Sequence, residues 1–350
     1  MIALAYHADL NELQDQPALA LLLDGPAQSA PFDRLAFWQG LARHCGVRPL
    51  VATARDTCSG KMAVLPLAQD GQRLGALANW YSFRVRPILS PGADGAALLG
   101  ALAQDLARRT GALVLAPLPD EGGEASLIER AFAGAGWLVW REECDTNHML
   151  DVQGRSFAAY LAGRPGPLRS TLKRRAGKVV CTVVSAFDPA IWAAYEEIYA
   201  HSWKPEEGSP AFLRAFAEAE GAAGRLRLGL ARDAASGQPV AAQMWSVEGG
   251  TAFIHKLAYR ADARALSPGT SLTAALMAHV IDIDRVAHVD FGTGDDPYKA
   301  DWMESHRPRY RLTMLRPGAP RQWPALARAL VRQLRARWRN TRLAQRPAHG

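Results

Sequence analysis

Polar side chains that can bind an anion or move a proton gather in three short segments in the second half of the chain. The segments are residues 255–259 (HKLAY), 267–271 (SPGTS) and 290–299 (DFGTGDDPYK). The first ends a strand-like alternation, and Pro268 and Gly269 open a predicted helix whose first amides are free to hold an anion. The three segments together predict a site for acyl transfer.

Hydrophobic periodicity predicts the elements that position these segments. In the second half, helices are expected at 188–203, at 210–223 and from residue 269, with strands at 226–232, 239–247, 251–259 and 286–291. The first half repeats this order, with helices at 11–24, 32–45 and 96–110 and strands at 48–55, 62–68, 84–89 and 112–116. Ser90-Pro91-Gly92 and Ser267-Pro268-Gly269 take equivalent places in the two halves, which indicates an internal duplication.

The three segments, in this order, resemble the FemAB-like branch of the GNAT acyltransferase superfamily. The resemblance covers most of the chain and is carried best by residues 195–312, where Ser202-Trp203-Lys204 also matches a family position. Pro31-Phe32 and Asn79-Trp80-Tyr81 match more loosely. Members of the family move an acyl or aminoacyl group onto an amine, some from acyl-CoA and some from charged tRNA.

The resemblance and the duplication predict an α/β fold of two tandem GNAT-like domains, each a mixed, mostly antiparallel twisted sheet flanked by helices. The expected boundaries are 1–153 for a scaffold domain that walls the acceptor cleft, 154–318 for the acyl-CoA-binding catalytic domain, and 319–350 for a basic amphipathic helix. Asp94 would repel a phosphate at the first helix, whereas Thr270 and Ser271 would receive one, so the donor is assigned to the second half.

His255 and Asp290 are the candidates for proton transfer. An ordinary histidine has a pKa near 6.5 and can take a proton from an ammonium, although a structural histidine beneath the sheet is an equal alternative from the residues alone. The strand alternation places one of His255 and Lys256 on the cleft side of the sheet and the other away from it. Asp290 is expected to accept the amine proton or to orient His255, with capping of the glycine loop at 292–294 as the alternative.

The other candidate residues bind the donor or the acceptor. Tyr298 is a candidate acid for the departing thiolate, and Lys299 a positive charge for the oxyanion or for an acidic group of the acceptor. The family resemblance implies roles for two further groups. These are Pro268, Gly269, Thr270, Ser271 and Arg174 for the CoA phosphates, and Trp203, Lys204 and Tyr81 for the substrate. For Arg174, binding of an acidic headgroup and a place on a solvated basic helix stay open as alternatives.

Several other kinds of chemistry are disfavoured. The chain has no G-x-S-x-G elbow, its DFG triplet lacks the other kinase motifs, and Asp295-Asp296 stands without further metal ligands. The prediction is therefore direct transfer from acyl-CoA as co-substrate, with no metal.

The charge of the chain is divided unevenly along it. Twelve of its 41 basic residues follow Glu304, and the part up to Glu304 has 29 basic against 34 acidic residues. The basic end has apolar residues at helical spacing, which predicts a helix that lies on an anionic membrane surface, with packing on the body as the alternative. Nucleic acid is not favoured as a partner. The N-terminus resembles neither a signal peptide nor a membrane span, which predicts a cytoplasmic protein, peripheral on the inner membrane.

The specific functional hypothesis is an N-acyltransferase that makes ceramide from acyl-CoA and a sphingoid base. Three alternatives stay open. They are acetylation of an amino sugar for a cell-surface polysaccharide, aminoacyl transfer from tRNA to a peptidoglycan precursor, and a non-catalytic binding protein on the same fold.

Overall fold

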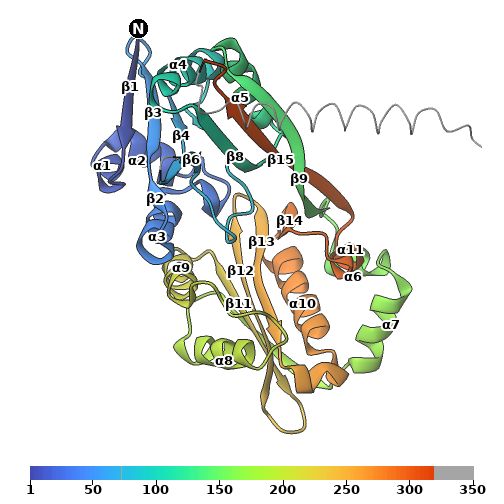
Figure 1. Cartoon of the computed structure of the whole chain (residues 1–350). Helices are drawn as coiled ribbons and strands as arrows, with labels where there is room; N and C mark the ends of the chain where they lie inside the picture. Colours follow the sequence, from blue (N-terminus) through green and yellow to red (C-terminus); the bar gives the residue numbers. More distant parts are fainter. Residues whose placement is uncertain (72, 319–350) are drawn as a thin grey trace, which may run out of the picture.

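The computed structural model describes residues 1–71 and 73–318, and these form two halves that share one sheet (Figure 1). The elements of the first half are β1 (Ile2–His7), α1 (Asn11–Gln14), α2 (Pro17–Asp24), η1 (Pro31–Asp33), α3 (Leu35–Cys45), β2 (Arg48–Pro49), β3 (Val51–Asp56), β4 (Met62–Leu65), β5 (Leu67–Asp70), β6 (Arg73–Ala76), β7 (Ile88–Leu89), α4 (Gly95–Arg109), β8 (Ala112–Leu118), α5 (Glu124–Gly134) and β9 (Leu138–Asp151).

The second half carries the segments with the candidate site residues. Its elements are α6 (Phe157–Ala162), α7 (Gly166–Arg175), β10 (Val179–Val184), α8 (Pro189–Ala200), α9 (Pro210–Ala222), β11 (Leu226–Asp233), β12 (Pro239–Glu248), β13 (Thr251–Tyr259), η2 (Ala261–Leu266), α10 (Pro268–Ala278), η3 (His279–Ile283), β14 (His288–Thr293), α11 (Pro297–Trp302) and β15 (Ser305–Leu315). The helices and strands predicted from residue 188 to residue 291 are all present, with ends that move by a few residues.

One sheet runs through both halves. Within the described residues it has eleven strands, in the order β10-β11-β12-β13-β14-β9-β15-β8-β6-β5-β2, and a second sheet has the order β1-β3-β4-β7. The β13–β14 and β6–β8 pairs are parallel, and the other pairs recorded for these residues are antiparallel. The predicted α/β fold with mixed, mostly antiparallel sheets is confirmed.

β9 and β15 tie the halves together, and hydrophobic periodicity did not predict either strand. β9 pairs with β14 of the second half and with β15, and β15 also pairs with β8 of the first half. Both strands are rich in charge, but the charges face each other across the ladder. The guanidinium of Arg141 lies 3.6 Å from the centre of the Tyr310 ring, and Arg311 lies 3.5 Å from Glu142. Such cross-strand pairs stabilise strands that carry no apolar alternation.

The first half differs from its prediction in several elements. β1, β6 and α5 were not predicted, the strand expected at 84–89 is only β7, and Pro17 begins a new helix within the region expected to be one helix. Asp94 caps α4 by accepting a hydrogen bond from the amide of Ala97 at 3.0 Å, so its carboxylate occupies the place where an anion would bind.

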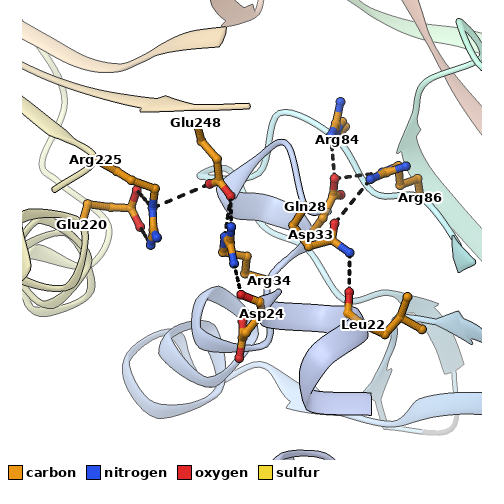
Figure 2. Close-up of polar contacts among 10 residues, drawn as sticks. All are labelled: Leu22, Asp24, Gln28, Asp33, Arg34, Arg84, Arg86, Glu220, Arg225 and Glu248. Carbon is orange, nitrogen blue, oxygen red and sulfur yellow. Dashed lines mark hydrogen bonds and ion pairs between the residues drawn. The ribbon is translucent and has the colours of Figure 1, made fainter. Parts of the chain in front are cut away.

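The two halves meet through a shared apolar core and a buried ionic network. Phe37 of α3 packs edge-on against Phe212 and Phe216 of α9, with ring centres 5.4 Å apart in both pairs. Figure 2 shows Arg34, which precedes α3, bonded to Glu248 at the end of β12. Since one core cluster includes residues of both halves, the region between them is a packed interface.

Two further predictions concern membranes. The predicted basic helix of residues 319–350 lies outside the described residues. In the part of the chain that is described, no helix combines the length and the hydropathy needed to cross a bilayer.

Candidate active site

The candidate site lies where β13 and β14 part. Their parallel pairing covers only Thr251 to Phe253 on β13, after which β14 continues beside β9. A cavity of about 200 Å³ opens at this divergence, and residues of both strands line it. We call it the lysine cavity because Lys204, Lys256 and Lys299 are among its lining residues.

A β-bulge shapes the β13 wall of this cavity. Met244 of β12 faces Lys256 and Trp245 faces Ile254, so His255 has no residue opposite it. A bulge changes the side to which neighbouring side chains point, and both His255 and Lys256 line the cavity. The expectation that one of the two faces away from it is therefore wrong.

His255 is held in an aromatic, weakly hydrated setting. Its Nε2 lies 2.7 Å from the hydroxyl of Ser246, and its ring lies 5.0 Å from that of Phe216 and 5.5 Å from that of Phe83. Burial, helped by the charge of Lys256, lowers the pKa of His255 to about 3. The imidazole is therefore neutral at physiological pH, so it can exchange hydrogen bonds but is a much weaker base than an ordinary histidine.

The lysines of the cavity differ in their partners. Lys256 donates to Glu207 at 2.8 Å, and Lys299 donates to the backbone carbonyls of Thr293 at 2.5 Å and Gly294 at 3.0 Å. Lys204 is half-buried, and burial together with the charge of Lys256 lowers its pKa to about 8. Lys204 is thus the basic group whose pKa is best matched to proton exchange with an amine near neutral pH.

Asp290 lies outside the cavity lining, in a buried polar chain. Its Oδ1 accepts hydrogen bonds from Asn147 and from the amide of Gly292, both at 2.7 Å. Arg309 donates to the same Asn147 side chain. Burial raises the pKa of Asp290. Because His255 is bonded to Ser246, the geometry matches the alternative prediction that Asp290 caps the glycine loop.

Gly292 of that loop tests how closely the cavity wall is packed. Its φ of +71° is unfavourable for other residues, and an added Cβ would lie 2.8 Å from the Phe83 ring. We expect Gly292→Ala to lower the free energy of unfolding by about 1–3 kcal/mol, measured by denaturant titration. Gly46→Ala is the matched control, because Gly46 has a similar φ of +67° and open space around it. Equal losses in both variants would show that contact with Phe83 costs nothing.

The predicted aromatic residues have separate positions. Tyr298 lines the lysine cavity, 42% exposed, and burial raises its pKa to about 12. Trp203 is 55% exposed and packs against Tyr259, with ring centres 4.3 Å apart. Tyr81 is buried and donates to Glu207 at 2.6 Å. Trp80 also lines the lysine cavity; the Asn79-Trp80-Tyr81 motif contained it, but it was not selected as a candidate.

The second half of the chain matches a known protein family. Residues 168–300 match the family model described as an acetyltransferase (GNAT) domain. This part of the chain is similar to GNAT acyltransferase domains. Among curated protein sequences, none matches the chain.

Solved structures show the tandem GNAT fold for nearly the whole chain. FemX is 10% identical with a TM-score of 0.60, covering 89% of this chain and 96% of its own. A tandem GNAT protein from the clavulanic acid biosynthesis pathway is 16% identical with a TM-score of 0.52, covering 89% and 98%. L-PGS from Bacillus licheniformis is 14% identical with a TM-score of 0.51, covering 86% and 96%. The predicted tandem fold is confirmed.

The predicted donor residues of the GNAT domain lie beyond the other end of β13. Pro268 is buried, and the side-chain amide of Gln243 donates to the carbonyl of Gly269 at 3.2 Å. A Cβ on Gly269 would lie 3.1 Å from the ring of Tyr259, so glycine allows the start of α10 to pack against the end of β13. Thr270 and Ser271 are half-buried in the first turn of α10.

Arg174 is exposed on α7, where it donates to Thr171 at 3.4 Å. Its predicted role, like that of the α10 turn, stays a prediction.

Metal ligation has no candidate cluster: across residues 1–71 and 73–318, no three His, Cys, Asp or Glu side chains come together to hold an ion. Asp295, half of the acidic pair, instead lies 2.9 Å from Nε2 of His148.

The lowered pKa of Lys204 can be tested directly. At pH 7.5 the neutral fraction of an amine with a pKa of about 8 is about 200-fold larger than that of an ordinary lysine with a pKa near 10.4. We expect brief treatment with acetic anhydride to acetylate Lys204 ahead of ordinary lysines, measured by peptide mass spectrometry across pH. In Lys256→Gln the loss of the neighbouring charge should raise the pKa of Lys204 and slow its labelling. Unchanged labelling in that variant would contradict this account.

Proposed function

We propose that this chain is an N-acyltransferase that moves an acyl or aminoacyl group directly onto an amine bound in the lysine cavity. The main support is the opening between β13 and β14, because it places a neutral imidazole and a lysine of lowered pKa on one cavity. The division into an N-terminal scaffold and a C-terminal catalytic domain is part of this proposal.

The proposed chemistry follows from the protonation states. The acceptor arrives as an ammonium, and neutral Lys204 takes its proton. The amine nitrogen then attacks the carbonyl carbon of the donor, a C–N bond forms, and the C–S or C–O bond to the leaving group breaks. The proton that the nitrogen loses as the amide forms balances the proton that the leaving group takes up. His255 orients the amine through a hydrogen bond, and the positive charges of Lys256 and Lys299 favour the oxyanion.

Tyr298 supports an ester donor over a thioester. Burial raises its pKa to about 12, so the phenol keeps its proton at all physiological pH values. A departing alkoxide is a far stronger base than a thiolate, so its departure is accelerated more when a weak acid such as the Tyr298 phenol protonates it. The shared fold with FemX and L-PGS also favours the aminoacyl-tRNA alternative over ceramide formation, which none of the compared structures supports.

The test measures release of the leaving group for each donor and acceptor. Acetyl-CoA, palmitoyl-CoA and a mixture of aminoacyl-tRNAs would each be incubated with a diamine, an amino sugar, a sphingoid base or no acceptor. Amine-dependent loss of the aminoacyl group from tRNA would support the ester donor, and release of CoA only with palmitoyl-CoA and the sphingoid base would restore the ceramide hypothesis. No amine-dependent release from any donor would contradict the proposal and favour a binding protein.

A further inference from the structure

A second cavity lies on the α8 and α9 side of the sheet and has the opposite charge. It measures about 410 Å³ and is lined by α8, by the segment that leads to α9, and by α9 itself. Three carboxylates, those of Glu196, Glu206 and Glu207, line it, and its described lining includes no lysine, arginine or histidine. We call it the carboxylate cavity.

Two polar groups of this cavity are buried without a partner. The side chain of Glu207 is 8% exposed; Oε1 accepts from Tyr81 and Lys256, but Oε2 has no hydrogen-bond partner among the described residues. The hydroxyl of Tyr195, a residue only 3% exposed, likewise has none in the described part. A buried carboxylate oxygen and a buried hydroxyl left in this way are costly unless a ligand supplies a donor.

Aromatic rings complete the chemistry of the site. Trp192, Tyr195 and Tyr199 of α8 line the cavity, and the ring centres of Trp192 and Tyr195 are 4.9 Å apart. Aromatic faces attract cations, and the attraction is larger where water is excluded. Carboxylates combined with aromatic rings therefore suit an organic ammonium group.

The carboxylate cavity adjoins the lysine cavity through Glu207. This residue bonds Lys256, which lines the lysine cavity, while its other oxygen is the unpartnered one. A smaller cavity is lined by His255, Lys256 and Leu213, and Leu213 also lines the carboxylate cavity. The cavities therefore share walls, and a ligand that passes these side chains would present one end to each cavity.

The position favours the acceptor as the source of this ligand. α8 belongs to the same hydrophobic core cluster as Met244 and Phe253. α10, where the donor is predicted to bind, belongs to a different core cluster, which contains Trp245 and Ile254. Neighbouring residues of a strand point to opposite faces, so the two helices cover opposite faces of the sheet (Figure 1).

We infer that the carboxylate cavity binds the distal ammonium of an acceptor that carries two amines separated by an alkyl chain. The inference rests on the proposed function, because the other amine of the same molecule is the one acylated in the lysine cavity. A primary ammonium has three N–H donors, and Glu207 Oε2 and the Tyr195 hydroxyl belong to lining residues and lack a donor within the described part of the chain.

Binding without any donor tests the cation site by itself. The full chain would be titrated calorimetrically with 1,5-diaminopentane, 1-aminopentane and the neutral 1-pentanol. We expect both amines to bind at least tenfold more tightly than the alcohol, and Glu207→Gln to remove most of that preference.

Tyr195→Phe should weaken amine binding severalfold without lowering the melting temperature, since it deletes an unpartnered buried hydroxyl. Glu218→Gln, an exposed change on α9 outside the cavity lining, should bind as the unchanged chain does. Equal binding of amine and alcohol, or no effect of either cavity variant, would overturn the inference.

Transfer assays separate this inference from the proposed function. With any donor that the chain accepts, 1,5-diaminopentane should have a KM at least tenfold below that of 1-aminopentane. Tyr195→Phe should reduce this difference in KM. Equal KM values would overturn the distal ammonium site and leave the transferase proposal intact. Specific amine binding with no transfer from any donor would leave the cation site intact and contradict the proposed function.

Discussion

Replacement of His255 by glutamine is expected to lower kcat/KM for acyl transfer by about 10²-fold, because the imidazole orients the attacking amine. The variant removes the imidazole that the β13 bulge places in the lysine cavity, and glutamine keeps a polar side chain of similar reach. The fold should survive, because the bulge depends on the β12–β13 register. The measurement is amine-dependent release of the leaving group, together with the melting temperature.

The pH profile distinguishes the roles of His255 and Lys204. His255 becomes charged only below its pKa of about 3, so the unchanged chain should show no rise in kcat/KM near pH 6.5. Lys204 loses its proton as pH rises through about 8, so kcat/KM should rise with pH up to that value, and Lys204→Gln should abolish the rise. Ser246→Ala, which removes the hydroxyl bonded to His255, should cost less than His255→Gln. A rise centred near pH 6.5 that disappears in His255→Gln would contradict this assignment.

Asp290→Ala is expected to lower the free energy of unfolding by about 2–4 kcal/mol, while the folded fraction keeps its activity. The change leaves the amide of Asn147 and the backbone amide of Gly292 without their buried acceptor. Denaturant titration gives the stability, and activity would be normalised to the folded fraction. Loss of activity in a variant of unchanged stability would show instead that Asp290 takes part in the reaction.

The isosteric variant Asp290→Asn adds a dependence on pH. Burial raises the pKa of Asp290, so its contribution to stability is fully present below the unfolded pKa near 3.9 and is lost as pH rises through the folded value. The amide side chain that replaces the carboxyl group does not titrate. The stability of Asp290→Asn relative to the unchanged chain should therefore increase as pH rises through that window, and a constant or opposite difference would contradict the raised pKa.

The elements around α10 could be predicted because their local pattern agrees with their final environment. β11 to β14 are apolar runs bounded by turns, and Pro268 begins α10. The partners of the site residues could not be predicted in the same way. Ser246 meets His255 only because β12 and β13 pair with an extra residue on β13, and a shift of one residue changes the face of every side chain beyond it.

Glu207 shows a second limit of sequence patterns. It lies in a short polar connection, KPEEGSP, that resembles a solvated loop, yet its side chain is buried where α8, Tyr81 and Lys256 converge. Its partners are 126 and 49 residues away in sequence. Contacts of that kind arise from tertiary packing and leave no local period or motif.

The arrangement of β9 has a consequence for how the chain is made. β9 has 14 residues and ends the first half, yet both strands beside it, β14 and β15, belong to the last part of the described sequence. A growing chain that has reached residue 153 therefore carries a long strand with two bare edges, and such edges pair readily with other chains. The edges of β9 therefore gain their partners only after residues 288–315 have been synthesised, and until then β9 is the strand of the first half most exposed to aggregation.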